Sequence, residues 1–403
     1  MVKPGYKQTE IGVIPEDWEI KYLSDFGKIQ SGGTPSTTMA EYWGGNIAWC
    51  TPSDITSTPT KYINVTERTI TEAGLNNSAA TVMPEGSILL CTRATIGELK
   101  INSIPMATNQ GFKNIIVNNS GNAEFLYYLL QTKKSRMLDL AIGSTFLEIS
   151  KTALSKILLQ IPMRDEQNKI ADALSDMDNL VVVLEKQIAK KKAIKQGAMQ
   201  ELLTGKRRLP GFAGEWKICR LDEIADFPTA TISTDQFDNR FYVGTDNMIA
   251  YKGDVKYNEL PLIYPKVRQY QTEDIILSNI RPYLQKIWYA TRNGGCSNDV
   301  LVIRKKDGHA VEPKFLYYQL SRDGFYDEIM ANAVGTKMPR GDKAIVKSYR
   351  INMPSDTAEQ KAIASILSDA DAEIKAMEEK LEKYRQVKQG MMQQLLTGKI
   401  RLV

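Results

Sequence analysis

Two segments of the chain carry apolar residues at alternating spacings of four and three positions. The first segment places them at Ile170, Leu174, Met177, Val181, Leu184 and Ile188, and the second at Ile363, Leu367, Ala370, Ile374, Met377, Leu381 and Tyr384. Heptad spacing of this kind puts one apolar stripe along an α-helix that packs against a second helix. We therefore predict two long helices of about 38 residues, roughly 55–60 Å each, paired as a coiled coil.

Local signals mark both ends of each predicted helix. A proline-containing extended segment precedes each helix, with Asp165 and Thr357 as candidate N-caps. Each helix is expected to end at a glycine, Gly205 or Gly398, that can take the left-handed conformation of a C-cap. Past the heptads the apolar stripe shifts to another face of the helix, which breaks the coiled-coil repeat.

The chain is a tandem duplication. Shifting it by 193 residues lays 166–209 on 359–402 without a gap, and 22 of these 44 positions are identical, including KQGxMQxLLTGK. Further landmarks recur in the same order: a Trp-containing segment at 17–26 and 215–224, FLYYLL at 125–130 and FLYYQL at 315–320, and AIGST at 141–145 and AVGTK at 333–337. A repeated order of landmarks defines the architecture.

The predicted fold class is α+β: a tandem pseudo-twofold duplication of two globular mixed α/β domains separated by two long helices packed as an antiparallel coiled coil. Antiparallel packing is favoured because two like halves related by a twofold axis perpendicular to the helices pack that way. The expected boundaries are an N-terminal arm (1–17), the first globular domain (18–163), the first long helix (164–205), a linker with the second globular domain (206–353), and the second long helix with a C-terminal tail (354–403).

Composition narrows the functional classes. The longest apolar runs are far shorter than the ~20 residues of a membrane span, and the N-terminus has no apolar signal core, so we expect a cytoplasmic protein with no membrane contact. Four scattered cysteines and one histidine, His309 in a polar turn-like stretch, favour neither a metal site nor a disulfide framework. The net charge of +5 permits a polyanionic partner without requiring one.

Catalytic motifs are lacking. GKIQSGGT at 27–34 has the glycine spacing of a P-loop, but Gly33 stands where the phosphate-binding lysine belongs. NIRPYL at 279–284 has one proline where the Asn-Pro-Pro-Tyr motif of amino-methyltransferases has two. We therefore predict that the chain is not an enzyme.

Polar residues follow apolar runs at comparable places in the two halves. SILLCTRATIG at 87–97 and DIILSNIRPYLQK at 274–286 each end in polar and basic residues, so that Arg93 and Arg281 stand just past matching predicted strands. Arg, Asn, Gln, Thr and Ser on strand-end loops can hydrogen-bond to base edges. The same stretches also fit simple turns with capping side chains, and the pattern alone leaves both interpretations open.

Taken together, these segments resemble the specificity (S) subunits of type I restriction-modification systems over essentially the whole chain. The resemblance is carried by IPEDWE (14–19), SGGTPST (31–37), EYWGG (41–45), TPSDI (51–55), RATIG (93–97), ATNQGF (107–112), SNIRPYL (278–284), CSND (296–299) and the two EQ-to-LLTGK helices. It implies a non-catalytic DNA sequence-specificity subunit. It also implies two target recognition domains that each read half of an asymmetric bipartite site, with the helices setting the spacing.

The resemblance also implies which residues contact DNA. In the first domain they are Ser31, Gly32, Gly33, Thr34, Thr51, Ser53, Arg93, Thr95, Thr108, Asn109 and Gln110. In the second domain they are Thr245, Ser278, Asn279, Arg281, Tyr283, Ser297, Asn298, Lys337 and Arg340. The second domain has PTATIST (228–234) in place of SGGTPST, so the two half-sites are expected to differ in sequence.

Partners and cofactors are implied in the same way. Two modification (methyltransferase) subunits are expected to dock on the helices, with restriction (motor-nuclease) subunits joining a complex that holds one S chain. No cofactor is expected on this chain. S-adenosylmethionine would belong to the modification subunit, an adenine-N6 methyltransferase, and ATP and Mg to the restriction subunit.

The shifted stripe and the repeated mid-helix glycines are the expected partner-binding surface. Its residues are Gly197, Met199, Leu202, Leu203, Gly390, Met392, Leu395 and Leu396. Glycine costs about 1 kcal/mol relative to alanine inside a helix, so its repetition at matching positions suggests close approach by another chain. The alternative interpretation of the whole chain is a coiled-coil scaffold that presents two protein-binding modules without DNA specificity.

Overall fold

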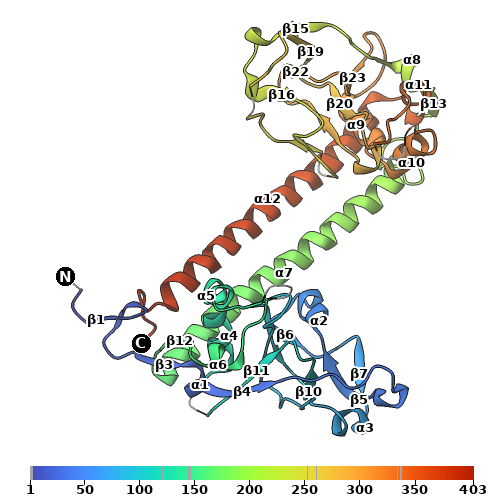
Figure 1. The fold of residues 1–403 in the computed structure, drawn as a ribbon. Coiled ribbons are helices and arrows are strands. Elements are labelled where there is room, and N and C mark those ends of the chain that lie inside the picture. The colour runs from blue at the N-terminus through green and yellow to red at the C-terminus, as the bar shows by residue number, and fades with distance from the viewer. Residues whose placement is uncertain are drawn as a thin grey trace. The chain divides into compact units, whose positions relative to one another are not determined.

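The computed structural model describes residues 3–119, 121–143, 147–251, 253–259, 261–333, 335 and 338–403. The chain forms two compact units (Figure 1). The first unit contains Met1–Glu185 and Lys380–Val403, and the second unit contains Lys186–Glu379. Each long helix therefore contributes one part to each unit. No helix among the described residues is long and apolar enough to cross a membrane.

The two predicted long helices are α7 (Arg164–Leu202) and α12 (Thr357–Leu395), each of 39 residues and drawn green and red in Figure 1. The heptad positions face inward, with Ile170 and Leu367 fully buried. Gly205 and Gly398 have φ of +73° and +70°, which confirms the left-handed C-cap conformation. Both predicted N-caps are wrong, because Asp165 lies inside α7 and Thr357 is the first residue of α12.

The first unit is built on small sheets, with its buried apolar residues in three clusters. Its five-stranded sheet has the order β4 (Gly27–Ser31), β11 (Lys113–Val117), β8 (Ile88–Leu90), β9 (Leu99–Asn102), β6 (Tyr62–Ile63). A three-stranded sheet has the order β10 (Met106–Thr108), β5 (Trp43–Cys50), β7 (Arg68–Ile70), and two pairs are β12 (Leu158–Ile161) with β3 (Glu19–Tyr22) and β1 (Tyr6–Thr9) with β2 (Gly12–Pro15). The short helices are α1 (Leu23–Phe26), η1 (Ala40–Tyr42), α2 (Pro52–Ser57), α3 (Glu72–Asn76), α4 (Ala123–Gln131), α5 (Lys134–Asp139) and α6 (Lys151–Ser155).

The second unit repeats this plan with differences. One four-stranded sheet has the order β14 (Ala225–Asp226), β23 (Val300–Lys305), β20 (Ile275–Ser278), β21 (Ile287–Tyr289), and another has β15 (Thr231–Ser233), β19 (Lys266–Tyr270), β22 (Gly294–Cys296), β16 (Tyr242–Val243). The pairs are β13 (Trp216–Arg220) with β24 (Arg350–Pro354) and β17 (Met248–Ile249) with β18 (Asp254–Val255). The short helices are α8 (Leu221–Ile224), η2 (Thr234–Gln236), η3 (Asn239–Phe241), η4 (Pro282–Leu284), α9 (Pro313–Leu320), α10 (Asp323–Ala331) and α11 (Lys343–Ser348).

Within each unit the segments of α7 and α12 run antiparallel. In the first unit Asp178 pairs with Lys388 at 2.5 Å and Glu185 with Arg385 at 2.6 Å, so later residues of α7 meet earlier residues of α12. The second unit repeats the first of these pairs, because Lys195 contacts Asp371 at 2.5 Å. Shifting Asp178 and Lys388 by 193 in opposite directions gives Asp371 and Lys195, so the duplication is also a structural repeat.

The end of each long helix is buried in the core of the unit it reaches. Leu395 and Leu396 are 5% and 0% exposed and belong to the core of the first unit, with Met392 packed against it. Met199, Leu202 and Leu203 are 5%, 6% and 0% exposed in the core of the second unit. Burial removes the five residues Met199, Leu202, Leu203, Leu395 and Leu396 from the predicted partner surface. Their apolar stripe shifts because it leaves the coiled coil and enters a domain core.

The two mid-helix glycines stand apart from that core. A Cβ added at Gly197 or at Gly390 would have no atom within 4 Å apart from its own helix and chain neighbours. The described residues therefore give no packing reason within this chain for either glycine. Their role in partner binding stays a prediction.

Each unit closes with a cluster that we call the clasp: Trp18, Glu166, Gly398 and Arg401 in the first unit, and Trp216, Glu359, Gly205 and Arg208 in the second. Arg401 donates to Glu166 at 2.7 and 2.8 Å, and Arg208 donates to Glu359 at 2.6 and 2.7 Å. The ring of each tryptophan lies against the glycine of its clasp. The repeated Trp, the Glu of EQ and the end of the LLTGK segment therefore recur in the sequence because they meet in space.

Candidate nucleic-acid interface

The first unit gathers polar residues where two parallel strands end side by side. β5 ends at Cys50 and its parallel neighbour β10 ends at Thr108. The amide of Asn109 donates to the carbonyl of Cys50 at 3.1 Å, so the residues that follow, Thr51 and Asn109, leave the sheet together. Loops at strand ends carry binding residues on a rigid support, which is the arrangement that the sequence predicted here.

The SGGT turn packs directly on that strand end. A Cβ at Gly32 would lie 2.1 Å from the carbonyl oxygen of Asn109, and a Cβ at Gly33 would clash with the backbone at 79–80, so both positions require glycine. The hydroxyl of Thr34 donates to the side-chain oxygen of Gln110. Ser31, the last residue of β4, pairs with Lys113. Ser31, Thr34, Asn109 and Gln110 therefore lie in one cluster.

The Arg93 loop joins the same cluster. Thr92 donates its amide to the carbonyl of Gly111 at 2.8 Å, which places Arg93 beside the Asn109 turn. The next residue, Ala94, has φ of +63°, a left-handed conformation that is uncommon for a residue with a Cβ. Backbone strain of this kind often occurs at functional sites.

Several predicted contacts of the first unit have structural roles instead. Thr108 is fully buried and its hydroxyl accepts a hydrogen bond from Asn114 at 2.8 Å, so it cannot reach DNA. The backbone of Gly32 and Gly33 is also buried. Thr51 is the N-cap of α2, in a capping box with Asp54.

Two more predicted residues of the first unit differ in exposure. The hydroxyl oxygen of Thr95 is buried, so Thr95 is a poor DNA contact. Ser53 is exposed on α2, and its contact with DNA stays a prediction.

The second unit repeats the parallel strand end. β16 and β22 run parallel and end at Val243 and Cys296. The amide of Ser297 donates to the carbonyl of Val243 at 3.0 Å, which matches the Asn109–Cys50 bond of the first unit. Thr245 follows β16, and its carbonyl accepts from Lys286 at 2.6 Å. Asn298, next to Ser297, is exposed.

A strained turn carries the basic residue of the second unit. Arg281 has φ of +50°, is exposed, and donates its amide to the carbonyl of Pro339 at 2.8 Å. Asn279 donates its amide to the carbonyl of Asp299 at 3.0 Å, and Arg340 pairs with Asp299 at 3.2 Å. The exposed Tyr283 lies in the same turn, so Asn279, Arg281, Tyr283 and Arg340 are brought together.

Two predicted residues of the second unit need separate comment. Ser278 is 4% exposed and its hydroxyl donates to the carbonyl of Ile280 at 3.1 Å, so it shapes the turn and does not face a ligand. Lys337 lies outside the described residues, as do parts of the AIGST and AVGTK segments. The proposed role of Lys337 stays a prediction.

Hydrogen bonds correct the predicted match between Arg93 and Arg281. The bond from Thr92 to Gly111 corresponds to that from Asn279 to Asp299, and the isolated bridge from Arg93 to Glu148 corresponds to that from Ile280 to Arg340. Arg93 therefore matches Ile280, and Ala94 matches Arg281, as their shared positive φ also indicates. The two arginines stand one position apart on equivalent turns.

The sequence analysis missed an aromatic stack at the same end of the first unit. The guanidinium of the exposed Arg68 lies 3.6 Å from the ring centroid of Trp43 and 5.5 Å from that of Trp49. The indole N–H of Trp49 donates to the carbonyl of Gly33 at 3.0 Å, which joins the stack to the SGGT turn. The tryptophans were part of recognisable motifs, but Arg68 lies on β7 and gives no local signal.

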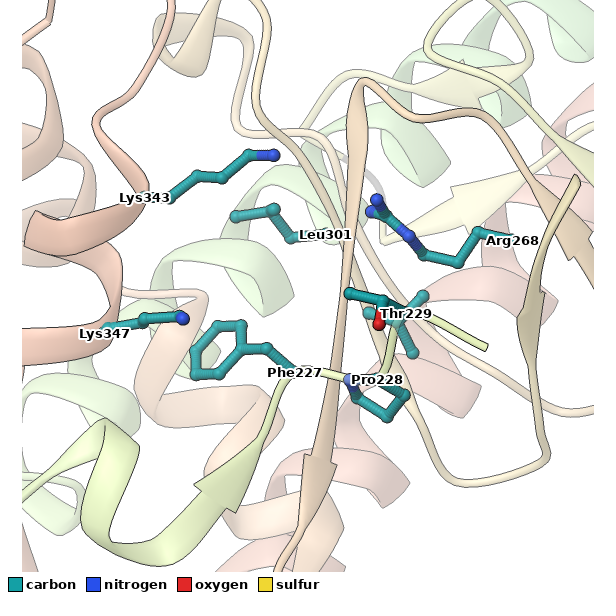
Figure 2. A pocket seen from close by; sticks show the side chains of 8 residues that line it. Phe227, Pro228, Thr229, Arg268, Leu301, Lys343 and Lys347 are labelled. Carbon is teal, nitrogen blue, oxygen red and sulfur yellow. The ribbon is translucent and has the colours of Figure 1, made fainter. Parts of the chain in front are cut away.

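A second missed group is basic and lies in the second unit. Arg268, Lys343 and Lys347 project toward one cavity from β19 and α11 (Figure 2). They come from segments 75 residues apart, so sequence proximity could not associate them.

The cysteines near the site are buried thiols, and the described residues form no metal centre. Burial raises the pKa of the Cys91 thiol to about 12, and burial does the same for Cys296 although Arg268 opposes it. All four cysteines are unpaired, and no His, Cys, Asp and Glu cluster among the described residues could hold a metal ion. His309, in the polar turn-like stretch, is exposed.

Fold and site together define a duplicated protein with two mixed α/β units, each presenting polar residues at the end of a parallel strand pair. The chain matches the family "Type I restriction modification DNA specificity domain" twice, over residues 15–196 and 213–384. It therefore belongs to this family, as a type I restriction-modification specificity subunit with two recognition domains and not an enzyme in its own right.

Known proteins agree with this assignment. The chain is 42% identical to the type I restriction enzyme MjaIX specificity subunit of Methanocaldococcus jannaschii over 184 residues, which is 45% of this chain and only 43% of that protein. It is 24% identical to the MjaVIII specificity subunit of the same organism over 96% of this chain and 94% of the relative.

Solved structures support the fold. The S subunit of a type I restriction-modification system from M. genitalium has a TM-score of 0.62 at 13% identity, and the match covers 98% of each chain. A chain from a study of complex assembly and conformational transition of the type I system has a TM-score of 0.59 at 14% identity, covering 96% of this chain and 99% of that one.

Proposed function

We propose that the two units read the two halves of an asymmetric bipartite DNA site. The observation that carries the proposal is the matched strand end: each unit presents polar residues from a parallel strand pair beside a strained, left-handed turn. Side chains on such rigid supports can form bidentate bonds to base edges. The residues at equivalent places differ, since Ala94 matches Arg281 and Arg93 matches Ile280, so the half-sites should differ in sequence.

The helices α7 and α12 are proposed to set the distance between half-sites and to dock two modification subunits, with restriction subunits joining the complex and one S chain in each complex. The buried leucines reduce the docking surface to the exposed faces of the helices around Gly197 and Gly390. S-adenosylmethionine would be supplied by the modification subunit, an adenine-N6 methyltransferase, and ATP and Mg by the restriction subunit. A cytoplasmic location follows from this role.

The test is to map methylated adenines in DNA modified by the full-length chain with its modification subunit. We expect Arg281→Ala to relax one half of the recognised sequence and Arg93→Ala to relax the other, each by about 1–3 kcal/mol of discrimination. Variant Ala94→Arg should also alter only the first half. An unchanged methylation pattern in all three variants, or changes spread over both halves, would contradict the assignment of one half-site to each unit.

A further inference from the structure

The second unit contains a small cavity of about 90 Å³ beside β23 (Figure 2). This is well above the roughly 10–15 Å³ needed to hold one water molecule. The residues that line it are Phe227, Pro228, Thr229, Arg268, Leu301, Val302, Lys343 and Lys347. In Figure 2 the two lysines extend from α11 on one side and Arg268 from β19 on the other.

The cavity exists because a strand ladder is shorter in the second unit. In the first unit β4 pairs with β11 over five residues, from Gly27 to Ser31. In the second unit β14 pairs with β23 only at Ala225 and Asp226. The chain leaves the sheet at Phe227, so among the described residues no strand pairs with Leu301 and Val302 on the side of β23 that faces β14. The second unit therefore has β23, the counterpart of β11, but with an open space beside it.

The lining of this cavity is cationic. It contains Arg268, Lys343 and Lys347 and no acidic residue. Arg268 donates to the carbonyl of Val300 at 2.6 Å, which fixes its guanidinium while leaving further N–H donors. The ammonium of Lys347 lies 5.3 Å from the ring centroid of Phe227. Among the described residues, none of the three cations forms an ion pair, so their charge is available to an anion.

The cavity lies next to the proposed base-reading residues of the second unit. Val300, which holds Arg268, pairs with Ser278 at the end of β20. Lys343 lies two residues after Gly341, whose amide donates to the carbonyl of Asn279 at 3.0 Å. In protein–DNA complexes phosphate contacts flank the base contacts and hold the protein in register.

We propose that this cavity binds one phosphodiester of the DNA backbone, with Arg268, Lys343 and Lys347 as its contacts. The inference rests on the proposed function and adds to it a backbone contact that only the second unit makes. The continued pairing of Ser31 with Lys113 closes the equivalent space in the first unit. An isolated acidic peptide is less favoured as the ligand, because the cavity adjoins the strand end and turn that the site residues share.

The experiment measures how the affinity of the full-length chain, with its modification subunit, for a duplex carrying its site depends on salt. Each neutralised phosphate contributes about 0.9 to the slope of log affinity against log salt concentration. The triple variant Arg268→Ala, Lys343→Ala, Lys347→Ala should lower that slope by about one and weaken all sequences alike. The matched control is Lys217→Ala, Lys305→Ala, Arg350→Ala, which removes three exposed cations from the same unit.

A second measurement does not depend on how well the triple variant folds. Neutral methylphosphonates are placed one at a time along the duplex, and the unaltered protein should lose affinity at one position beside the second half-site. Equal slopes for the two triple variants, or no sensitive phosphate at that half-site, would overturn the cavity proposal. Absence of any site-specific binding by the unaltered protein would overturn the proposed function itself, so the two failures are distinguishable.

Discussion

The clasps of the two units consist of equivalent residues but differ in their hydrogen bonds. In the first unit the indole N–H of Trp18 donates to Glu166 at 3.0 Å, and Arg401 also reaches Asp17 at 2.6 Å. In the second unit the indole N–H of Trp216 is buried without a partner among the described residues. A buried unsatisfied donor costs about 1–3 kcal/mol. The duplicated residues therefore keep their positions in the clasp, but the hydrogen bond of the indole N–H is made in the first unit and not by Trp216 among the described residues.

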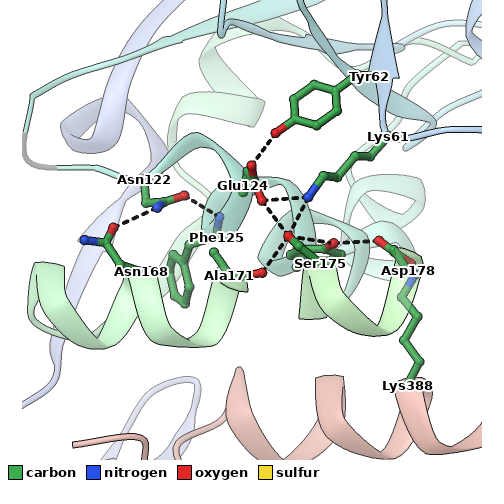
Figure 3. Close-up of polar contacts among 11 residues, drawn as sticks. Lys61, Tyr62, Asn122, Glu124, Phe125, Asn168, Ala171, Ser175, Asp178 and Lys388 are labelled. Atoms are coloured by element: carbon green, nitrogen blue, oxygen red, sulfur yellow. Dashed lines mark hydrogen bonds and ion pairs between the residues drawn. The ribbon is translucent and has the colours of Figure 1, made fainter. Parts of the chain in front are cut away.

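The two units also differ in the polar contacts that hold the helix containing the FLYY sequence, which is α4 in the first unit and α9 in the second (Figure 3). In the first unit Glu124 at the start of α4 accepts from Lys61 at 2.6 Å and from Ser175 of α7 at 2.5 Å, and from Tyr62. At the equivalent place of the second unit Lys314 donates to Ser368 of α12 at 2.6 Å. A carboxylate network and a single lysine thus perform the same task, which shows that the scaffold tolerates opposite charges at one position.

The largest expected effect comes from replacing one buried leucine in each unit with alanine. Leu396→Ala should destabilise the first unit and Leu203→Ala the second, each by about 2–5 kcal/mol, because both side chains are fully buried. Leu203 comes from the first sequence repeat but lies in the core of the second unit, and Leu396 comes from the second repeat but lies in the core of the first unit. Each substitution should therefore destabilise the unit formed mainly by the other repeat. Hydrogen exchange resolved by peptide measures this, because loss of protection in each unit can be followed separately.

Matched controls keep the test specific. Ile194→Ala and Val387→Ala remove exposed apolar side chains from the same two helices, and they should change protection little. If Leu203→Ala weakened residues 18–161 and left the second unit intact, the placement of the helix ends would be wrong.

Much of the scaffold could be predicted because its signals are local. The heptads at Ile170 and Ile363 and the left-handed Gly205 and Gly398 depend on neighbours within a few residues. What the end of each helix contacts depends on the return of the chain from about 190 residues away. Leu203 and Leu396 were therefore assigned to a partner surface, although they fill a core.

The site was predicted less well, for a different reason. Its general position, past a strand rich in apolar residues, was correct for Arg93 and Arg281. Their one-residue offset appears only in the hydrogen bonds of Thr92 and Asn279, because the two turns have too little sequence in common to be aligned residue by residue. Thr108 was named through the family resemblance, and only the fold shows that it is buried and hydrogen-bonded to Asn114.

The clasp comparison can be tested directly at its tryptophans. Trp18→Phe should destabilise the first unit by about 1–2 kcal/mol, because a hydrogen bond to a buried charged group is lost. Trp216→Phe should leave the second unit unchanged or slightly more stable, because it removes an unsatisfied donor. Unit-resolved hydrogen exchange again provides the measurement. Equal destabilisation by the two variants would mean that the indole N–H groups are equally satisfied in solution.

The smallest expected effect is on how the stability of each unit depends on pH, because Glu124 of the first unit is replaced by Lys314 in the second. Burial raises the pKa of Glu124, but the hydrogen bonds from Lys61, Ser175 and Tyr62 together outweigh burial and lower it. A carboxyl with a lowered folded pKa stabilises the folded state above its unfolded value of about 4.3, and this contribution is lost as the pH falls through the folded pKa. The first unit should therefore lose stability below about pH 4.3 by a step that Glu124→Gln removes.

The second unit supplies the internal reference for that measurement. The contact of Lys314 with Ser368 involves no carboxylate, so it adds no acid-dependent step, and Lys314→Met should leave the acid profile of the second unit unchanged. Other carboxylates also contribute to the acid dependence of both units. The contribution of Glu124 is therefore the difference in stability between the parent protein and the variant at each pH. If Glu124→Gln shifted both profiles equally, or neither, the network in Figure 3 would not distinguish the two units energetically.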